Sequence, residues 1–431
     1  MQSSLGPLGS HSAEPASGVS GAVKPSLRDQ YEAVRRASEA LASGLSPEDQ
    51  MVQSMPDASP TKWHLAHTTW FFETFILAEH LPGYQSFESD FRFLYNSYYK
   101  QLGSHPNRAT RGTFSRPPHA RVMQYRQHVN QRMMDLLDNG VPPEVADLVV
   151  LGLNHEQQHQ ELIVTDIKHA FWVNPLRPAY KNEIAQIGGG PVSPMQWQRL
   201  EGGVVHIGHP GSDFAFDNEL PRHDFLLRPF RLASRLVTNA EYLQFMDDQG
   251  YRRPELWLSD GWDTVLAQGW QAPMYWERNG DRWQTFTVAG IRNVEMNEPV
   301  CHVSYYEADA FARWSGARLP VEQEWEVAAR SQSVSGNFAE SGRFHPAPAS
   351  NSQMFGDVWE WTASPYVAYP GFKPGSGAIG EYNGKFMCNQ FVLRGGSCAT
   401  PQSHIRSTYR NFFPPSARWQ FMGIRLAADE S

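Results

Sequence analysis

The chain has 431 residues, of which 41% are hydrophobic, and a formal net charge of -8 at pH 7. This apolar content suffices for two or three domains with cores of their own. The negative charge argues against a nucleic acid or an anionic membrane surface as the main partner. The sequence holds no run near the roughly 18–20 apolar residues of a membrane-spanning helix, so no membrane partner is expected.

Residues 1–25 begin with MQSSLGPLGSHSAEPASGVSGAV, which is rich in Ser, Gly, Pro and Ala. This composition is typical of a disordered tail, and it lacks the basic start and apolar core of a secretion signal. The three cysteines, Cys301, Cys388 and Cys398, show no CxxC spacing. We therefore expect free thiols in a reducing compartment and a cytoplasmic location.

The first half of the chain predicts four helices. Ser26 and Asp29 cap the first, YEAVRRASEALASGL, which Gly44 ends. Ser59 as cap and Pro60 in the first turn open the second, KWHLAHTTWFFETFILAEHL.

The third helix is expected over about 118–137, and the fourth from the prolines at 142–143 to Asn174. A long loop, about 83–117, separates the second and third helices. This arrangement predicts an up-and-down bundle over residues 26–175.

After a linker at 176–196, the composition changes, and residues 197–431 are rich in Gly, Trp and short apolar stretches. This composition predicts irregular β structure, with helices over about 237–250, 304–316 and 322–330. The fold class expected for the whole chain is therefore α+β.

The segment HEQQH places His155 and His159 four residues apart on one helical face, within reach of a single ion. Because bundles build sites from facing helices, His67 of the second helix is the expected third ligand. His64, in the same WHLAH segment, is expected to be a satisfied core side chain. Three imidazoles suit zinc, iron or copper equally well, so the spacing leaves the metal open.

Near these histidines lie four further candidates. Gln158 and Glu161, about one turn from the ligands, are placed to hydrogen-bond a substrate or orient an imidazole. Tyr98 and Tyr99, in LYNSYYK on the long loop, are candidates to bring a phenol to the metal.

The chain resembles the iron-dependent sulfoxide synthases of ergothioneine biosynthesis over about residues 26–428. In the first half the resemblance rests on WHLAH, YNSYY, NHEQQHQEL and TDIKHAFWVNPLRPAY. In the second half it rests on VTNAEYLQF, ARLPVEQEWEVAAR, FGDVWEWTASPY, EYNGKFMCNQFVLRGGSCAT and YRNFFPPSARWQFMGIRLA. It implies a DinB-like four-helix bundle followed by a formylglycine-generating-enzyme (sulfatase-modifying-factor) domain, a variant of the C-type lectin fold.

The resemblance implies an Fe(II) site at His67, His155 and His159. It also implies a reaction that uses O2 to join a thiol to carbon 2 of the imidazole of hercynine, which is trimethyl-histidine, and that forms a sulfoxide. Gln158 and Glu161 would then face the hercynine imidazole.

The second domain would contribute Asn411, Phe412 and Phe413 around the trimethylammonium group, because aromatic faces attract such a cation. By the same resemblance, Tyr98 and Tyr99 match active-site tyrosines of the branch that uses cysteine, and one of them would donate a proton. Which tyrosine does so stays open.

The sulfur donor also stays open, because KQLGSHPNRATRGTFSRP departs from the family's usual continuation after NSYY. Arg108, Arg111 and Arg116 in this loop are candidates to bind a donor carboxylate through paired hydrogen bonds. A related branch makes selenoneine from a selenosugar, so formation of a carbon–selenium bond is an alternative.

Two other functions compete with this interpretation. HEQQH also matches the HExxH pattern of zinc hydrolases, in which Glu156 would be the general base and oxygen would not be needed. A lectin-like binding module beside a structural bundle would instead tolerate the loss of any one histidine. The sequence does not indicate an oligomeric state.

Overall fold

The computed structural model describes residues 25–184, 192–348, 353–375, 377 and 380–430. All but the last residue of the predicted tail lie outside the described residues, and so does the centre of the predicted linker, 185–191.

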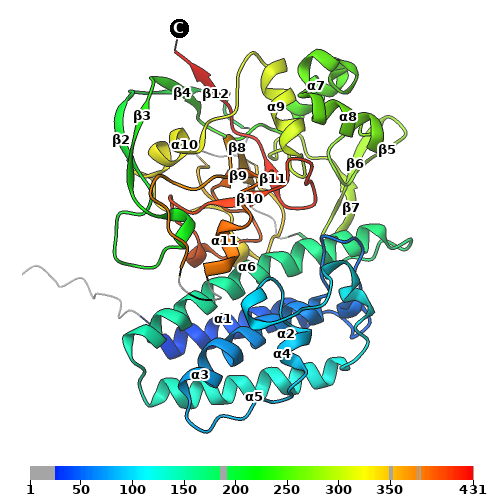
Figure 1. The fold of residues 1–431 in the computed structure, drawn as a ribbon. Helices are drawn as coiled ribbons and strands as arrows, with labels where there is room; N and C mark the ends of the chain where they lie inside the picture. The colour runs from blue at the N-terminus through cyan, green and yellow to red at the C-terminus, as the bar shows by residue number, and fades with distance from the viewer. Residues whose placement is uncertain (1–24, 185–191, 349–352, 376, 378–379, 431) are drawn as a thin grey trace, which may run out of the picture.

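Four long helices form the N-terminal bundle, in the lower half of Figure 1. They are α1 (Leu27–Ala42), α2 (Thr61–Phe72), α5 (His119–Asp138) and α6 (Pro143–Val173). A π-helical turn, Glu73–Leu77, continues α2 into α3 (Ala78–His80). Short helices lie outside the four: 3-10 turns at Asp49–Met51, Lys100–Leu102 and Arg108–Thr113, and α4 (Phe91–Leu94).

The two predicted helix starts had different outcomes. The Ser26 side chain accepts from the Asp29 backbone, and the Asp29 carboxylate accepts from the Ser26 backbone, as predicted. The prediction for α2 was wrong by one residue, because Pro60 occupies the N-cap position and makes no side-chain hydrogen bond there. The backbone N–H of Ser59 instead donates to the Asp166 carboxylate at 2.8 Å. This acceptor comes from α6, so local sequence does not reveal it.

The described residues of the C-terminal half form four small sheets. Their strand orders are β1-β4-β12, β2-β3, β5-β6-β7 and β10-β9-β8-β11, and among these strand pairs β8–β11 is parallel and the others are antiparallel. The strands are β1 (Trp197–Leu200), β2 (Gly203–Ile207), β3 (His223–Leu227), β4 (Phe230–Ala233), β5 (Trp276–Asn279), β6 (Arg282–Thr287), β7 (Gly290–Asn293), β8 (Trp359–Pro365), β9 (Phe391–Arg394), β10 (Asn411–Phe413), β11 (Met422–Gly423) and β12 (Ala427–Asp429).

Helices of the C-terminal half include the three that the sequence predicts, α7 (Asn239–Asp247), α9 (Tyr305–Trp314) and α10 (Glu322–Ala329). Two helices were not predicted, α8 (Ser259–Gln268) and α11 (Glu381–Gly384). Further 3-10 turns among the described residues are Asp217–Glu219, Gly250–Arg252, Pro254–Leu256, Ala339–Ser341 and Gln402–His404. The chain has the predicted α+β fold.

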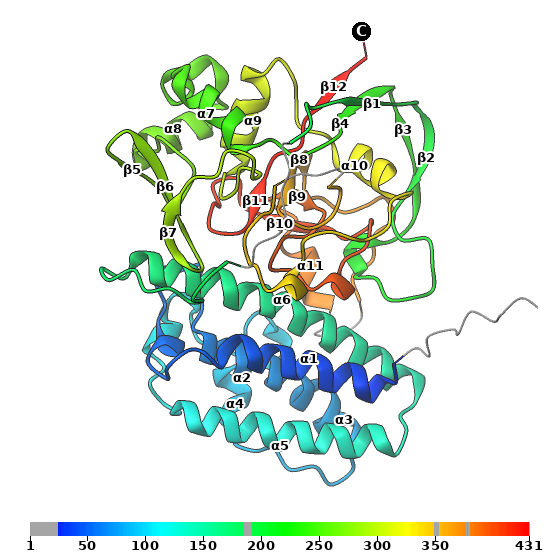
Figure 2. The same cartoon turned by 180° about the vertical axis from the view of Figure 1, so that it is seen from behind.

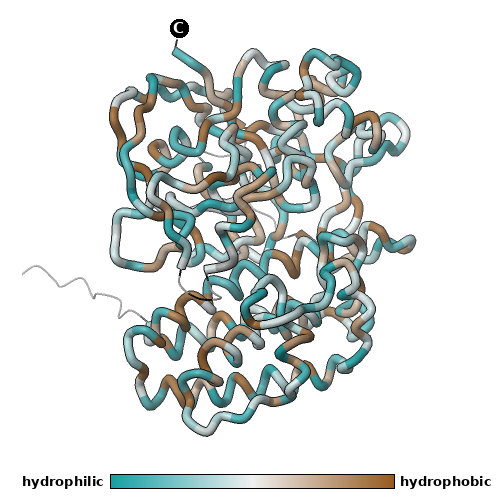
Figure 3. Tube along the Cα trace, in the orientation of Figure 1, coloured by the Kyte–Doolittle hydropathy of each residue, from teal (hydrophilic) through white to brown (hydrophobic). Residues whose placement is uncertain are grey.

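Helix α6 belongs to both halves of the molecule. Its N-terminal residues Val145 and Val149 lie in the core of the bundle, whereas Ile167 and Phe171 lie in the core of the C-terminal half. Figures 1 and 2 show α6 between the bundle and the strands from both sides. Apolar stretches run through both halves of the trace in Figure 3, as two cores require. The helix that carries HEQQH therefore lies at the junction of the two halves.

Candidate metal centre

Helices α2 and α6 bring three imidazoles together. One ring nitrogen of each of His67, His155 and His159 lies within 4.8 Å of the others, and all three residues are buried. Burial lowers the pKa of His155 to about 4 and the pKa of His67 and of His159 well below the usual range. The rings are therefore neutral at pH 7, which is the form that binds a cation.

His67 is oriented by a backbone carbonyl. Its Nδ1 lies 2.6 Å from the Tyr95 carbonyl oxygen. Because that oxygen only accepts, Nδ1 carries the proton and Nε2 keeps a lone pair for a metal.

His159 is oriented by a relay of two buried side chains. Asp166 accepts from His64 Nε2 at 3.1 Å, and His64 Nδ1 lies 2.8 Å from His159 Nδ1. A carboxylate only accepts, so the proton of neutral His64 is on Nε2 and its Nδ1 accepts from His159. This arrangement leaves His159 Nε2 unprotonated. His64 thus supports a candidate ligand, as well as being the core side chain that the sequence predicts.

Glu156, the general base of the zinc-hydrolase alternative, faces away from this centre. Arg35 and Arg126 donate to its two oxygens at 2.8 and 2.6 Å, and Ser38 donates at 2.6 Å. Burial by itself would raise the pKa of Glu156, but the two guanidinium groups hold it at about 2. A fully buried carboxylate in two ion pairs cannot act as a general base for water, so the structure contradicts that role.

A cavity of about 310 Å³ opens beside the three imidazoles, between the bundle and the C-terminal half. Of the residues that the sequence analysis places at the metal or its substrates, Arg116 is exposed and does not line the cavity. The others line it: His67, Tyr98, Tyr99, Arg108, Arg111, His155, Gln158, His159, Glu161, Asn411, Phe412 and Phe413. Folding thus gathers candidates that are more than 300 positions apart in the chain.

Gln158 and Glu161 reach across to the second half of the chain. Gln158 donates from Nε2 to the Tyr409 hydroxyl at 2.8 Å. The Glu161 carboxylate accepts hydrogen bonds from Trp359, Ser397 and Thr400. Glu161 therefore joins the two halves at the cavity wall, a role that sequence reasoning missed.

The loop after α3 supplies the two tyrosines. The Tyr99 ring is buried and lies 5.6 Å from Trp70 and 5.2 Å from Phe75, centroid to centroid. The Tyr98 hydroxyl accepts a hydrogen bond from Arg108 at 3.3 Å. The two phenols therefore have different surroundings, one apolar and one cationic.

Arg111 is buried, with 4% of its surface exposed, whereas a loop arginine is usually solvated. Its guanidinium lies 3.4 Å from the centroid of the Trp63 ring and donates to Ser59 and Ser97 at 2.9 and 2.8 Å. Burial lowers the pKa of Arg111 to about 9, so it is still cationic at pH 7. A desolvated cation in the wall favours an anionic group in the cavity.

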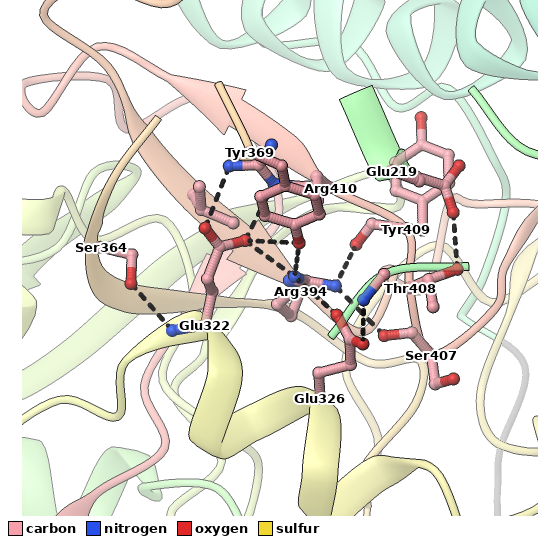
Figure 4. Close-up of polar contacts among 12 residues, drawn as sticks. Glu219, Glu322, Glu326, Ser364, Tyr369, Arg394, Ser407, Thr408, Tyr409 and Arg410 are labelled. Atoms are coloured by element: carbon pink, nitrogen blue, oxygen red, sulfur yellow. Dashed lines mark hydrogen bonds and ion pairs between the residues drawn. The ribbon is translucent and has the colours of Figure 1, made fainter. Parts of the chain in front are cut away.

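The opposite wall is anchored by buried ion pairs. Arg410, which precedes β10, donates to both oxygens of Glu322 at 2.9 and 3.0 Å. Arg394 binds the same carboxylate at 2.7 Å, as Figure 4 shows. Phe412 of β10 stacks on Tyr366 with the ring centroids 4.1 Å apart. These contacts hold Asn411 and the two phenylalanines that follow it at the cavity.

Other lining residues were missed from the sequence. Trp63 lies in the WHLAH segment and Tyr409 two positions before Asn411, so a search around the motifs would have found both. Phe386 lies in the EYNGKFMC segment and had the same kind of signal, whereas His404 lies between the quoted motifs and reaches the cavity only through folding.

Comparison with known proteins agrees with this architecture. Residues 30–163 match the DinB superfamily, and residues 193–351 and 333–430 match the sulfatase-modifying factor enzyme 1-like domain. The hercynine oxygenase of Mycolicibacterium smegmatis is 32% identical over 414 residues, which cover 88% of this chain and 92% of that protein. The chain belongs to the hercynine oxygenase family.

Two more relatives bear on the two halves. The hercynine oxygenase of Mycobacterium tuberculosis is 32% identical over 87% of this chain and 92% of its own length. A formylglycine-generating enzyme of Streptomyces coelicolor is 29% identical over 54% of this chain and 88% of its own length. This member of the hercynine oxygenase family therefore combines a DinB-like bundle with a formylglycine-generating-enzyme-like domain, as the sequence predicts. The two matched family models confirm the combination.

Within the described part of the chain, none of the helices combines the length and apolar character needed to cross a bilayer.

Proposed function

We propose that this protein is an Fe(II)- and O2-dependent enzyme that forms a carbon–sulfur bond at imidazole C2 of hercynine. The observation that carries the proposal is the set of three neutral, buried imidazoles beside a cavity with aromatic and cationic walls. Support comes from two relatives that are named hercynine oxygenase and that match nearly the full length of this chain.

In this proposal His67, His155 and His159 hold the iron. Iron supplies the redox chemistry with O2 that zinc lacks, and a thiol bound to a cation ionises more readily. The His67–Tyr95 and His159–His64–Asp166 contacts suit such a metal, because each leaves Nε2 of the ligand available.

The cavity walls would divide the binding of the two substrates. Asn411, Phe412 and Phe413 would surround the trimethylammonium end of hercynine, and Gln158 would meet the imidazole. Glu161 would contribute to the same part of the wall through its bridge to the second half.

Arg108 and Arg111 would bind the carboxylate of a thiol donor such as cysteine. Arg108 donates a hydrogen bond to the Tyr98 hydroxyl. A carboxylate bound by Arg108 would therefore lie next to a candidate proton donor. Tyr98 and Tyr99 are both kept as candidates for that proton transfer. A selenosugar carries no carboxylate, and carbon–selenium bond formation is the alternative that the experiment below measures.

We also propose that the two domains span residues 26–175 and 197–431 and that the protein works in the cytoplasm. The first helix begins at Leu27, the fourth ends at Val173 and the first strand begins at Trp197. The three cysteines are free thiols, as a reducing compartment allows.

The test is metal analysis of the purified protein followed by oxygen uptake with hercynine, with a donor and with both. We expect about one iron per chain, and uptake only when both substrates are present. Mass spectrometry of parallel reactions with cysteine, γ-glutamylcysteine and a selenosugar identifies the donor.

His159→Ala is expected to abolish iron binding and oxygen uptake while the fold is kept. His206→Ala, which removes an exposed histidine of β2, is the matched control and should change neither. Full activity of His159→Ala, or activity with zinc in the absence of oxygen, would contradict the proposal.

A further inference from the structure

A chain of hydrogen bonds leaves α6 at Asn154, passes through the second half of the protein and returns to α6 at Gln158. Asn154 Oδ1 lies 3.0 Å from His404 Nδ1, and His404 Nε2 lies 3.0 Å from the Tyr409 hydroxyl. Tyr409 in turn accepts from Gln158 Nε2 at 2.8 Å. Asn154 and Gln158 each lie next to a histidine of the candidate metal centre.

The direction of the first bond follows from the chemistry of Asn154. Its Nδ2 donates to the Val150 carbonyl at 3.0 Å, so the atom turned toward His404 is the oxygen. An amide oxygen only accepts, and the proton of His404 must therefore be on Nδ1. Burial lowers the pKa of His404 well below the usual range, so the ring is neutral and its Nε2 can only accept.

The direction then passes to Gln158. The Tyr409 hydroxyl donates its proton to His404 Nε2, and its oxygen accepts the amide N–H of Gln158. One N–H of the Gln158 amide is thereby donated to Tyr409, which fixes the orientation of the amide, and Oε1 is the atom of this group that can accept a ring N–H. His404 and Tyr409 are 1% and 4% exposed, so bulk water does not relax this order.

We infer that Asn154, His404 and Tyr409 fix Gln158 as a hydrogen-bond acceptor and so make the site select a substrate ring that carries an N–H. A neutral imidazole with one nitrogen available to a metal carries its proton on the other nitrogen. This inference rests on the proposed function and specifies that the substrate ring must carry a proton on the nitrogen that does not face the metal. The three residues are positioning residues, because they act through Gln158.

The test compares anaerobic binding of two rings to the iron-loaded, full-length protein by calorimetry. One ligand is hercynine, and the other is its oxazole analogue, in which oxygen replaces the ring N–H at nearly the same size. Because an oxygen facing an acceptor loses a hydrogen bond and gains a repulsion, we expect the wild type to bind the analogue about 100-fold more weakly.

Tyr409→Phe removes the acceptor of the amide nitrogen, so Gln158 can turn and offer its N–H. We expect the preference for hercynine over the analogue to fall to about tenfold or less in this variant. His404→Phe should act in the same direction, because it removes the acceptor of the Tyr409 proton, and it serves if Tyr409→Phe does not fold. Tyr242→Phe is the control, since it deletes another buried hydroxyl that contacts Tyr251 in the C-terminal half.

An analogue that binds the wild type as tightly as hercynine would overturn the inference, and so would a preference that Tyr409→Phe and His404→Phe leave unchanged. In both cases the proposed function would still stand, because the wild type binds hercynine. A wild type that binds neither ring would contradict the proposed function itself and this inference with it.

Discussion

Asp166 and His64 are not candidate metal ligands, but their hydrogen bonds orient His159. If Asp166 sets the proton positions in this relay, its replacement by an amide weakens that control, because an amide can donate as well as accept. We predict that Asp166→Asn lowers iron affinity about 10–100-fold, the range for residues that orient metal ligands. Competition with a chelator measures this affinity, and Asp147→Asn, at an exposed position of α6, should leave it unchanged.

Glu156 provides a second test at the residue scale. Glu156→Gln leaves Arg35 and Arg126 without their buried partner, which is expected to cost about 3–5 kcal/mol of the free energy of unfolding. The pKa of Glu156 is lowered from 4.5 to about 2 in the folded state. Its stabilising contribution is therefore present above pH 4.5 and is lost as the pH falls toward 2.

Urea unfolding of both proteins between pH 3 and 7 measures this difference, which should shrink at the acid end. Glu144→Gln, on the exposed surface of α6, serves as the control. An equally stable Glu156→Gln protein would show that the ion pairs contribute nothing. The folded fraction of the variant should still bind iron, because Glu156 does not face the three imidazoles.

At the scale of elements, the close packing of α6 against α2 depends on Gly152. A Cβ at this position would lie 2.7 Å from the Phe72 ring and 2.9 Å from the Phe71 ring. We predict that Gly152→Ala lowers the free energy of unfolding by about 1–3 kcal/mol, since overpacking outweighs the better helix propensity of Ala. Weaker iron binding should accompany it, because α2 carries His67.

Chemical denaturation and chelator competition check both effects. Gly44→Ala is the control, because a Cβ there meets no atom within 4 Å. Should Gly152→Ala prove as stable as Gly44→Ala, the two helices would be less tightly packed than the structure indicates.

At the scale of the whole molecule, Lys168 of α6 is buried against the second half, where it contacts His302 and lies 4.3 Å from the Tyr275 ring. Burial lowers its pKa from 10.5 to about 7. Between pH 7 and 10.5 the unfolded chain therefore holds a proton that the folded protein has lost, so raising the pH favours the folded state.

Lys168→Met keeps a side chain of similar length and removes this titration. We predict that the stability of the wild type relative to Lys168→Met rises between pH 7 and 10, by at most about 1.4 kcal/mol per pH unit. Denaturant midpoints of both proteins across this range give the slope. A difference that does not change with pH would mean that Lys168 keeps an ordinary pKa in the folded protein.

Much of the bundle and of the site could be predicted because both depend on local patterns. Helical periodicity and capping residues placed four helices, and the four-residue spacing of His155 and His159 required that they share a face. The motifs around Asn411 and the tyrosine pair placed further residues that do line the cavity. The domain bounds and the identity of the metal remain predictions.

The sequence by itself determined which residues can form helices, which residues can bind a metal and to which family the chain is similar. Only the tertiary structure decided that Asp166 receives the Ser59 N–H at the start of α2, that Glu156 is turned away and that Arg111 is buried. It also decided that the Gln158 amide donates to the Tyr409 hydroxyl. The physical reason is that hydrogen-bond direction and burial depend on partners that are distant in the chain, and packing alone brings such partners within reach.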